Sequence, residues 1–246
     1  MYCLYVKGVG VTASFRVPET HTFHQTLPLP SRTMMIGLMG AALGLSVADA
    51  HSFVRENGIF VSVYGKSQGM MKDLWNYRKV TNKPFSESEM KSRPHYSVLT
   101  REYLVYPEFM FVYASEDVDS LSRIRDAFKR PVYALTAGNS DDLLKITEVS
   151  DVQNLSPEML SEFEYTVLPG DFASKCKYDL KSILKGTPVT FSFHMPEVYS
   201  LPTDFVFAGE IRSGVNVSPF TFIRNKVSVS EPIEGFVVDG KNLVLY

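Results

Sequence analysis

Three adjacent residues at a predicted helix entry are of the types that bind phosphate. Ser31 stands directly before a periodic apolar run and is typical of a helix N-cap, with Arg32 and Thr33 in the first turn. A helix N-terminus leaves backbone N–H groups unpaired and carries the positive end of the helix dipole. The sequence therefore offers an anion site here. The glycines on one face of the same run equally suit a tight contact with a neighbouring sheet.

A second group of cationic side chains lies in residues 65–101. The segment has no clear periodicity and contains two glycines and two prolines, which indicates a long hairpin or a projecting loop. Its basic residues outnumber Asp73, Glu87 and Glu89; from residue 66 onward they are Lys66, Lys72, Arg78, Lys79, Lys83, Lys91, Arg93 and Arg101.

The charge of the chain is unevenly distributed. The net charge of −2 argues against a protein that coats nucleic acid over its whole surface. Residues 1–101, however, hold 12 Lys and Arg against 6 Asp and Glu, whereas residues 102–246 hold 13 against 21. One half of the molecule is thus suited to a polyanion and the other to water or a basic partner.

Several kinds of site lack the residues that they need. Cys3 and Cys176 cannot build a disulfide framework or a cysteine zinc site, and the pair His21 and His24 does not complete a zinc shell. No nucleotide-binding glycine loop, nucleophile elbow or paired carboxylate cluster is present, so no metal or cofactor is expected. The apolar run Met34–Ala48 is too short for a bilayer, and no secretory signal is evident, so we expect a cytoplasmic protein without a membrane partner.

The elements that must position these residues predict an α+β fold. The order strand–helix–strand–strand–helix–strand over residues 2–146 is ferredoxin-like, and the C-terminal part is a series of short β segments. We expect a domain at 1–150 and a β-rich region at 151–246, which forms either the rest of the same sheet or a small second domain. The predicted elements are strand Tyr2–Phe15, helix Arg32 to about Asp49, strand Ile59–Tyr64, a strand pair or bent strand Glu102–Ala114, helix Asp117–Arg130, and a strand–turn–strand over Tyr133–Ile146.

The most aromatic strand offers two interpretations. Phe109, Phe111 and Tyr113 alternate as base-stacking residues do in RRM domains. The basic residue and glycine that precede the aromatics in that pattern are missing. We therefore expect these side chains in the core.

Two stretches resemble the CRISPR-associated Cas-five family. The family has a first strand, an F-R-x-P-E element, a Pro-x-Pro turn and a glycine-rich helix ending in A-A-L-G-L; here Ala13 to Ser46 reads ASFRVPETHTFHQTLPLPSRTMMIGLMGAALGLS. The second stretch, from Phe128 to Ile146, reads FKRPVYALTAGNSDDLLKI. Asn139 stands in it where relatives often carry a basic residue.

This resemblance implies a role as well as a fold. Members of this RAMP superfamily branch have an RRM-like ferredoxin fold with a projecting β-hairpin thumb, placed here at about 65–101. They cap the 5′ handle of the CRISPR RNA in the Cascade complex of type I systems, here I-B or I-A-like, of bacteria or archaea. Their partners are the backbone subunit of the Cas-seven family, the large subunit and, indirectly, target DNA. The RNA contacts expected here are Arg16, Ser31, Arg32 and Thr33 at the helix entry, and Lys66, Lys72, Arg78 and Lys79 in the thumb.

Two other functions stay open. A type I-C branch of the family cuts precursor CRISPR RNA without metal, using Tyr, Lys and His, and the residues available here are Tyr64, Lys66, His95 and Tyr96. The adjacent Lys-His pair of that branch is absent, because His95 follows Pro94, so the resemblance supplies no catalytic residue. The remaining alternative is a protein-interaction module without specific RNA binding.

Overall fold

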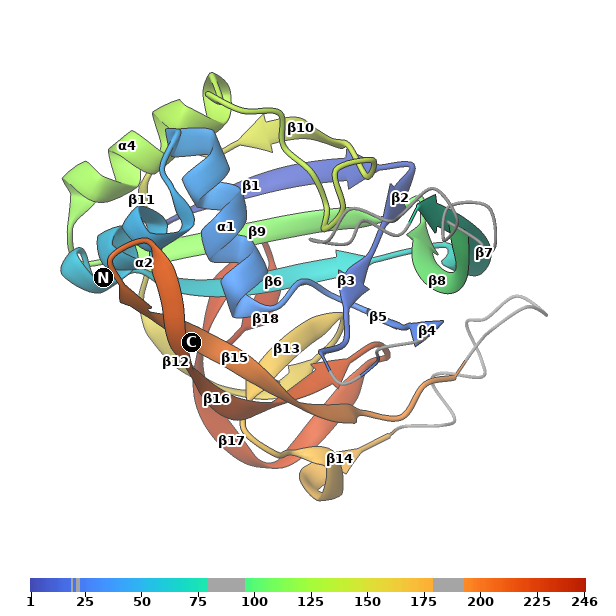
Figure 1. Cartoon of the computed structure of the whole chain (residues 1–246). Coiled ribbons are helices and arrows are strands. Elements are labelled where there is room, and N and C mark those ends of the chain that lie inside the picture. Colours follow the sequence, from blue (N-terminus) through green and yellow to red (C-terminus); the bar gives the residue numbers. More distant parts are fainter. Residues whose placement is uncertain (19, 21–22, 79–95, 179–192) are drawn as a thin grey trace, which may run out of the picture.

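The computed structural model describes residues 1–18, 20, 23–78, 96–178 and 193–246 (Figure 1). Four strands lie side by side in the order β10-β1-β9-β6, and each is antiparallel to its neighbours. In chain order these are β1 (Tyr2–Gly10), β6 (Phe60–Lys66), β9 (Glu108–Ser115) and β10 (Leu144–Val149). Helices follow β1 and β9, which confirms a mixed fold of α-helices and β-strands.

The helix predicted from Arg32 to about Asp49 is instead two helices, α1 (Arg32–Leu43) and α2 (Val47–Glu56). Gly44 ends α1 with a φ of 76°, a left-handed conformation that glycine adopts without steric cost. Ser46 then caps α2 by accepting a hydrogen bond from the Asp49 backbone N–H at 3.2 Å. The two helices meet at a bend of 103°.

On the glycine-bearing face of α1, Gly40 packs on α2 and not on a sheet. A Cβ placed at Gly40 would lie 2.7 Å from the Cβ of Ala50, so the two helices approach as closely as backbone allows. Gly37, by contrast, is exposed and has no atom within 4 Å of the same position. The glycine spacing is thus explained by a helix–helix contact at one position only.

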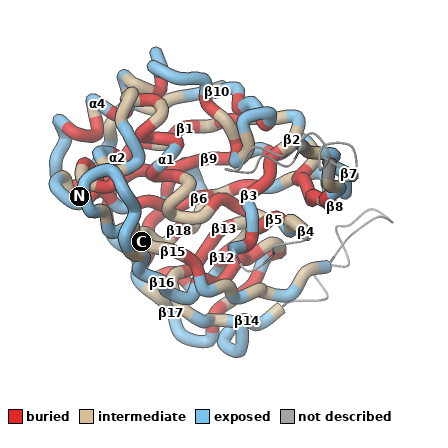
Figure 2. Tube along the Cα trace, viewed as in Figure 1, coloured by how far each residue is buried: buried red, intermediate tan, exposed pale blue. Residues whose placement is uncertain are grey.

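Along β9 the residues of both faces of the sheet are buried, and its trace is coloured accordingly in Figure 2. The first face packs against α1, α2 and α4 (Val118–Lys129). It carries Phe109, Phe111 and Tyr113, each at most 4% exposed, which confirms that this aromatic row is core. The Tyr113 hydroxyl donates a hydrogen bond to the carbonyl oxygen of Met35 at 3.0 Å.

The C-terminal region covers the second face and also extends the sheet. Phe236, Val238 and Leu243 pack against the β9 residues that point away from the helices. They belong to a second sheet of β12 (Pro157–Phe163), β17 (Val227–Val238), β14 (Cys176–Lys177) and β18 (Lys241–Leu243). The first sheet continues past β6 through β13 (Thr166–Pro169), β16 (Ile211–Ile223) and β15 (Glu197–Ala208); β11 (Gln153–Asn154) pairs with β1, and a 3₁₀ turn, η1, spans Ala173–Lys175.

Residues 69–78 and 96–105 form an antiparallel pair that lies away from the helices (Figure 1). Its strands are β7 (Gly69–Arg78) and β8 (Tyr96–Val105), and residues 79–95 between them lie outside the description. One basic residue of this segment is internal: Arg101 is 4% exposed, and its guanidinium lies 4.4 Å from the centre of the Trp75 ring. The short strands β2 (Thr12–Ala13) and β4 (Phe23–His24) pair with β8, and β3 (Phe15–Arg16) pairs with β5 (Thr26–Leu27).

Three predicted strands have different bounds. Tyr2–Phe15 is divided among β1, β2 and β3, and Glu102–Ala114 is divided between β8 and β9, which belong to different sheets. The second break falls at Tyr106, whose φ of 44° cannot continue an extended strand. In Tyr133–Ile146 the structure has β10 and one isolated bridge, Thr136 to Leu143, in place of a strand pair.

Among the described residues, no helix on its own is long and apolar enough to cross a membrane; α1 and α2 pass that test only as a bent pair. Within the same ranges, no group of three or more His, Cys, Asp or Glu is placed to hold a metal ion.

Leucine substitutions at Gly37 and Gly40 test the α1–α2 contact. Leucine at position 40 must displace Ala50, and we expect a loss of about 1–3 kcal/mol in the free energy of unfolding, or more. Leucine at the exposed position 37 should gain up to about 1 kcal/mol, because it removes a helix-interior glycine. Urea titrations of both variants measure this; equal effects at the two positions would contradict the packing described.

Candidate functional site

The side chain of Arg32 makes hydrogen bonds that hold the fold together. Its Nε donates a hydrogen bond to the carbonyl oxygen of Thr203 at 3.0 Å, and its Nη1 donates to that of Tyr246 at 2.8 Å. Burial lowers the pKa of this guanidinium. The side chain therefore joins α1 to β15 and to the C-terminal residue.

The start of α1 is capped from within the chain. The Ser31 Oγ accepts a hydrogen bond from the Met34 backbone N–H at 3.4 Å and lies 3.3 Å from the Thr33 hydroxyl, which confirms Ser31 as the N-cap. Arg16 is exposed, and its guanidinium donates to the carbonyl oxygen of Thr20 at 3.0 Å.

The predicted basic residues of the hairpin are spread along it. The Lys72 ammonium lies 3.7 Å from a Glu102 carboxylate oxygen and 5.0 Å from the centre of the Phe23 ring. Arg78 is the last residue of β7, and Lys79 lies outside the described residues. Lys66 is at the hairpin base, with its side chain about half exposed and 3.5 Å from Glu108.

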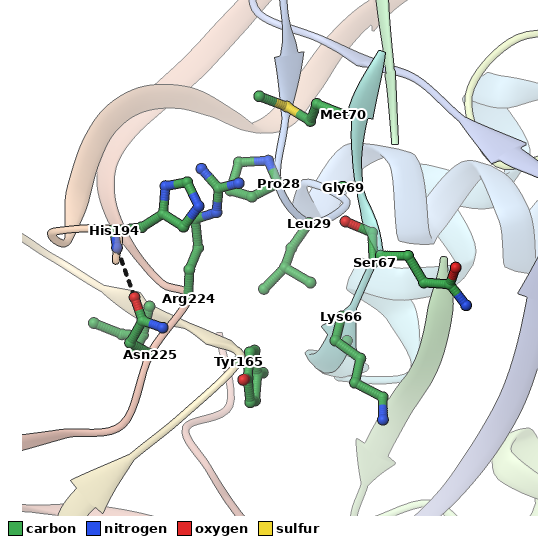
Figure 3. Close-up of a pocket in the computed structure, with 13 residues that line it drawn as sticks. Pro28, Leu29, Lys66, Ser67, Gly69, Met70, Tyr165, His194, Arg224 and Asn225 are labelled. Carbon is green, nitrogen blue, oxygen red and sulfur yellow. Dashed lines mark hydrogen bonds between the residues drawn. The ribbon is translucent and has the colours of Figure 1, made fainter. Parts of the chain in front are cut away.

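A cavity of about 530 Å³ opens beside Lys66 (Figure 3). Three parts of the chain enclose it. They are the loop before α1, the link from β6 to β7, and the C-terminal region. The lining residues are Pro28, Leu29, Gly65, Lys66, Ser67, Gln68, Gly69, Met70, Tyr165, His194, Ile223, Arg224 and Asn225. Below, we call this the basic pocket.

The described residues that line the basic pocket include cationic groups and no carboxylate. Arg224 has one acidic neighbour outside the lining, Glu197, at 3.6 Å. Figure 3 shows the His194 ring beside the Arg224 guanidinium, across the pocket from Lys66. Burial, and then the charge of Arg224, lower the pKa of His194, so this imidazole is neutral at pH 7.

Hydrogen bonds to backbone groups hold both sides of the basic pocket in place. Asn225 is 6% exposed, and its Oδ1 accepts a hydrogen bond from the His194 backbone N–H at 2.7 Å. On the facing side, the Gly65 N–H donates to the carbonyl oxygen of Tyr165 at 2.9 Å. A concave site with cationic walls and fixed polar groups suits an anionic ligand.

Of the predicted contact residues that the structure describes, Lys66 lines the basic pocket and the others lie elsewhere. Sequence analysis missed Arg224, His194 and Tyr165. They come from segments more than 90 residues beyond Lys66, and no local motif marks them.

The residues considered for cleavage are not gathered at the basic pocket. Tyr64 packs edge-on against Tyr165, with the two ring centres 5.8 Å apart, and does not line the pocket. His95 lies outside the described residues, and Tyr96 is the first residue of β8.

The glycine turn of the second resembling stretch has a structural role. A Cβ at Gly138 would lie within 1.9 Å of the Ser14 carbonyl oxygen, so this position requires glycine. Asp142 is 1% exposed and accepts hydrogen bonds from Thr12 and from the Asn139 side chain. Asn139 is therefore held within its own turn.

A family model described as "CRISPR-associated protein (Cas_Cas5)" matches residues 3–203. The chain belongs to this family. In this Cas-five chain the matched region includes Lys66 and His194 and ends before Arg224. No curated protein matches the sequence.

Two solved structures share the Cas-five fold over nearly the whole chain. A chain of a "CRISPR RNA-guided surveillance complex" is 13% identical with a TM-score of 0.53, and the match covers 94% of this chain and 91% of that one. A CRISPR protein from Archaeoglobus fulgidus is 10% identical with a TM-score of 0.50, covering 100% and 99%. Because the sequence identities are this low, these two matches show a shared fold only.

The role of Arg32 predicts a loss of stability on substitution. Arg32→Ala removes two charge-assisted hydrogen bonds and leaves two carbonyl groups without their donor, so we expect the free energy of unfolding to fall by about 2 kcal/mol or more. Arg32→Lys should recover only part of the lost free energy of unfolding, because an ammonium lacks the planar fork that reaches both oxygens. Denaturant titration measures both.

Arg16→Ala is the control, since its exposed side chain bonds to a carbonyl group four residues away. Its effect should stay within about 0.5 kcal/mol. An Arg32→Ala protein as stable as the wild type would contradict the structural role.

Proposed function

We propose that this protein is a non-catalytic RNA-binding subunit of a type I CRISPR effector complex, in which it holds the 5′ handle of the CRISPR RNA. In such a complex it contacts the backbone subunit of the Cas-seven family and the large subunit, meets target DNA indirectly, and acts in the bacterial or archaeal cytoplasm. The observation that carries the proposal is the basic pocket, whose charged lining is cationic, in a chain of the Cas-five family.

The arrangement of strands supports a ferredoxin-like assignment. The order β10-β1-β9-β6, with helices on one face, places the first and third strands of the motif at the centre. The hairpin of β7 and β8 leaves this platform between the second and third strands, and we assign it as the thumb.

The covered sheet determines how RNA is held. An RRM binds bases on the sheet face opposite its helices, and here the second sheet packs on that face. We therefore expect the protein to bind the sugar-phosphate backbone of the RNA, at the basic pocket and along the thumb. Lys66 belongs to both, because it lines the pocket and stands at the base of the hairpin.

Paired substitutions test this site. Lys66→Ala combined with Arg224→Ala removes two cations from the pocket, and we expect handle RNA to bind about tenfold or more weakly. The slope of log affinity against log salt should become shallower by about 1.4, since each phosphate contact to single-stranded RNA contributes about 0.7. Fluorescence anisotropy from 50 to 200 mM salt measures both values.

Lys129→Ala combined with Lys145→Ala is the matched control, because these lysines lie on α4 and β10. A scrambled RNA of the same length tests the alternative of a protein-interaction module, which predicts no preference for the handle. Unchanged affinity and slope in the pocket variant would contradict the proposed site.

One observation favours a second candidate function, metal-independent cleavage of precursor RNA. A neutral histidine can take the proton of a ribose 2′-hydroxyl, and His194 lies beside the Arg224 guanidinium in a pocket that also holds Lys66. Incubating repeat RNA with the protein in EDTA, followed by a denaturing gel, separates the candidates. Intact RNA supports the scaffold; a single cut that His194→Ala abolishes supports the nuclease.

A further inference from the structure

The backbone around Arg224, one of the cations of the basic pocket, is anchored in the fold. Arg224 directly follows β16, and both of its neighbours in the chain are buried, Ile223 at 0% and Asn225 at 6% exposed. Asn225 also accepts the hydrogen bond from the His194 backbone N–H. The Cα of Arg224 is therefore fixed, and the direction of its guanidinium depends on the contacts of the side chain itself.

One carboxylate contacts this guanidinium. Glu197 is the first residue of β15, and strand register aligns it with Phe222, two residues before Arg224. Its Oε1 lies 3.6 Å from the Arg224 Nη1. Arg224 lines the basic pocket, where Figure 3 shows its guanidinium beside the His194 ring, whereas Glu197 does not line it. Because a guanidinium has five N–H donors, contact with one carboxylate leaves donors for an anion in the pocket.

The carboxylate of Glu197 is itself held in place. The Tyr199 hydroxyl donates a hydrogen bond to the Glu197 Oε2 at 2.7 Å. The Tyr199 ring packs edge-on against the fully buried Phe222, with the ring centres 5.5 Å apart. Burial, and then the hydrogen bond to Glu197, raise the pKa of Tyr199, so its hydroxyl keeps its proton at neutral pH and stays a donor. A series of contacts thus runs from the core through Tyr199 and Glu197 to Arg224.

The charge of Glu197 and its contact with Arg224 act on phosphate binding in opposite directions. A carboxylate beside the pocket repels a phosphate. The Glu197 side chain is 39% exposed, however, so dissolved ions screen this repulsion, with a Debye length of about 8 Å at physiological salt. An arginine side chain that is ordered before binding loses less entropy when it takes up the phosphate. We expect this second effect to be the larger at physiological salt.

We propose that Glu197 is a positioning residue of the RNA site, which together with Tyr199 holds the guanidinium of Arg224 ready for a phosphate in the basic pocket. This inference rests on the proposed function, because the phosphate belongs to the bound RNA. It gives a role in RNA binding to a carboxylate outside the pocket. The binding of an anion should then weaken when a negative charge near the pocket is removed, which is opposite to the effect that net charge predicts.

Two substitutions at position 197 test the sign of this effect. Glu197→Ala should weaken handle RNA binding about threefold to tenfold at physiological salt. The slope of log affinity against log salt should become shallower by up to about 0.7, because the Arg224 contact is lost. Glu197→Gln keeps an oxygen that can accept from the guanidinium, so its affinity should lie between those of Glu197→Ala and the wild type. Fluorescence anisotropy measures both quantities; tighter binding by both variants would overturn the proposal.

A double-mutant cycle tests whether Glu197 acts through Arg224. In an Arg224→Ala chain, the further change Glu197→Ala should alter the affinity by less than about twofold. Tyr199→Phe keeps the ring and loses the hydroxyl, so it should weaken binding less than Glu197→Ala does and add nothing to that variant. An equal loss of affinity from Glu197→Ala with and without Arg224 would overturn the positioning role.

Glu158→Ala is the matched control, because it makes the same change in charge at an exposed position of β12 that does not line the basic pocket. It should bind handle RNA as the wild type does. A loss as large as that of Glu197→Ala would overturn the assignment of the effect to Glu197.

The outcomes separate the two proposals. If the wild type binds handle RNA no better than scrambled RNA, the proposed function fails, and the inference about Glu197 fails with it. If the wild type prefers the handle and Lys66→Ala with Arg224→Ala weakens binding, while Glu197→Ala leaves affinity and salt slope unchanged, the inference about Glu197 alone fails.

Discussion

Burial of the central sheet on both faces is the constraint on which the rest of the structure depends. On β9, Phe111 and Tyr113 face the helices while Met110 and Val112 face the second sheet, and each is at most 4% exposed. A strand buried on both sides must be apolar at nearly every position, which accounts for the unbroken run FMFVYA from Phe109 to Ala114. With both faces of β9 covered, cavities open at the edge of the sheet and at the seam where the two sheets meet.

The seams bring together residues that are far apart in the sequence. Arg224, directly after β16, lines the basic pocket, and Lys241 of β18 lines a neighbouring cavity of about 230 Å³; Lys66 lines both. The acidic excess of residues 102–246 therefore does not describe the basic pocket, where that half of the chain supplies Arg224 and no carboxylate. The net charge of a sequence segment is a poor guide to the charge of a site when strands from both halves of the chain share a sheet.

Local elements of the structure could be predicted because interactions between residues close in the sequence determine them. Ser31 before a periodic run identified the start of α1, and the amphipathic spacing of 117–130 identified α4. The helix break at Gly44 was missed because the apolar period continues through it, while the left-handed glycine and the Ser46 cap decide the structure. The aromatic row of β9 was assigned to the core correctly because its flanking residues lack the RRM pattern.

The site was predictable only in part. Lys66 could be identified from its basic segment. Arg32 is also cationic and stands at a predicted anion site, but its side chain joins α1 to β15. Nothing near Arg224 or His194 in the sequence indicates a pocket, because the fold brings them to Lys66 across more than 120 residues of sequence. A single sequence does not show which distant strands pair, or in which register they pair.

Hydrogen–deuterium exchange of the full chain, with and without handle RNA, tests the central claim most directly. RNA bound at the basic pocket should protect the backbone amides of residues 63–70 and 222–227, while α4 exchanges at the same rate in both states. Protection confined to α1 and α2, with residues 63–70 and 222–227 unchanged, would show that RNA binds elsewhere and would contradict binding at the basic pocket.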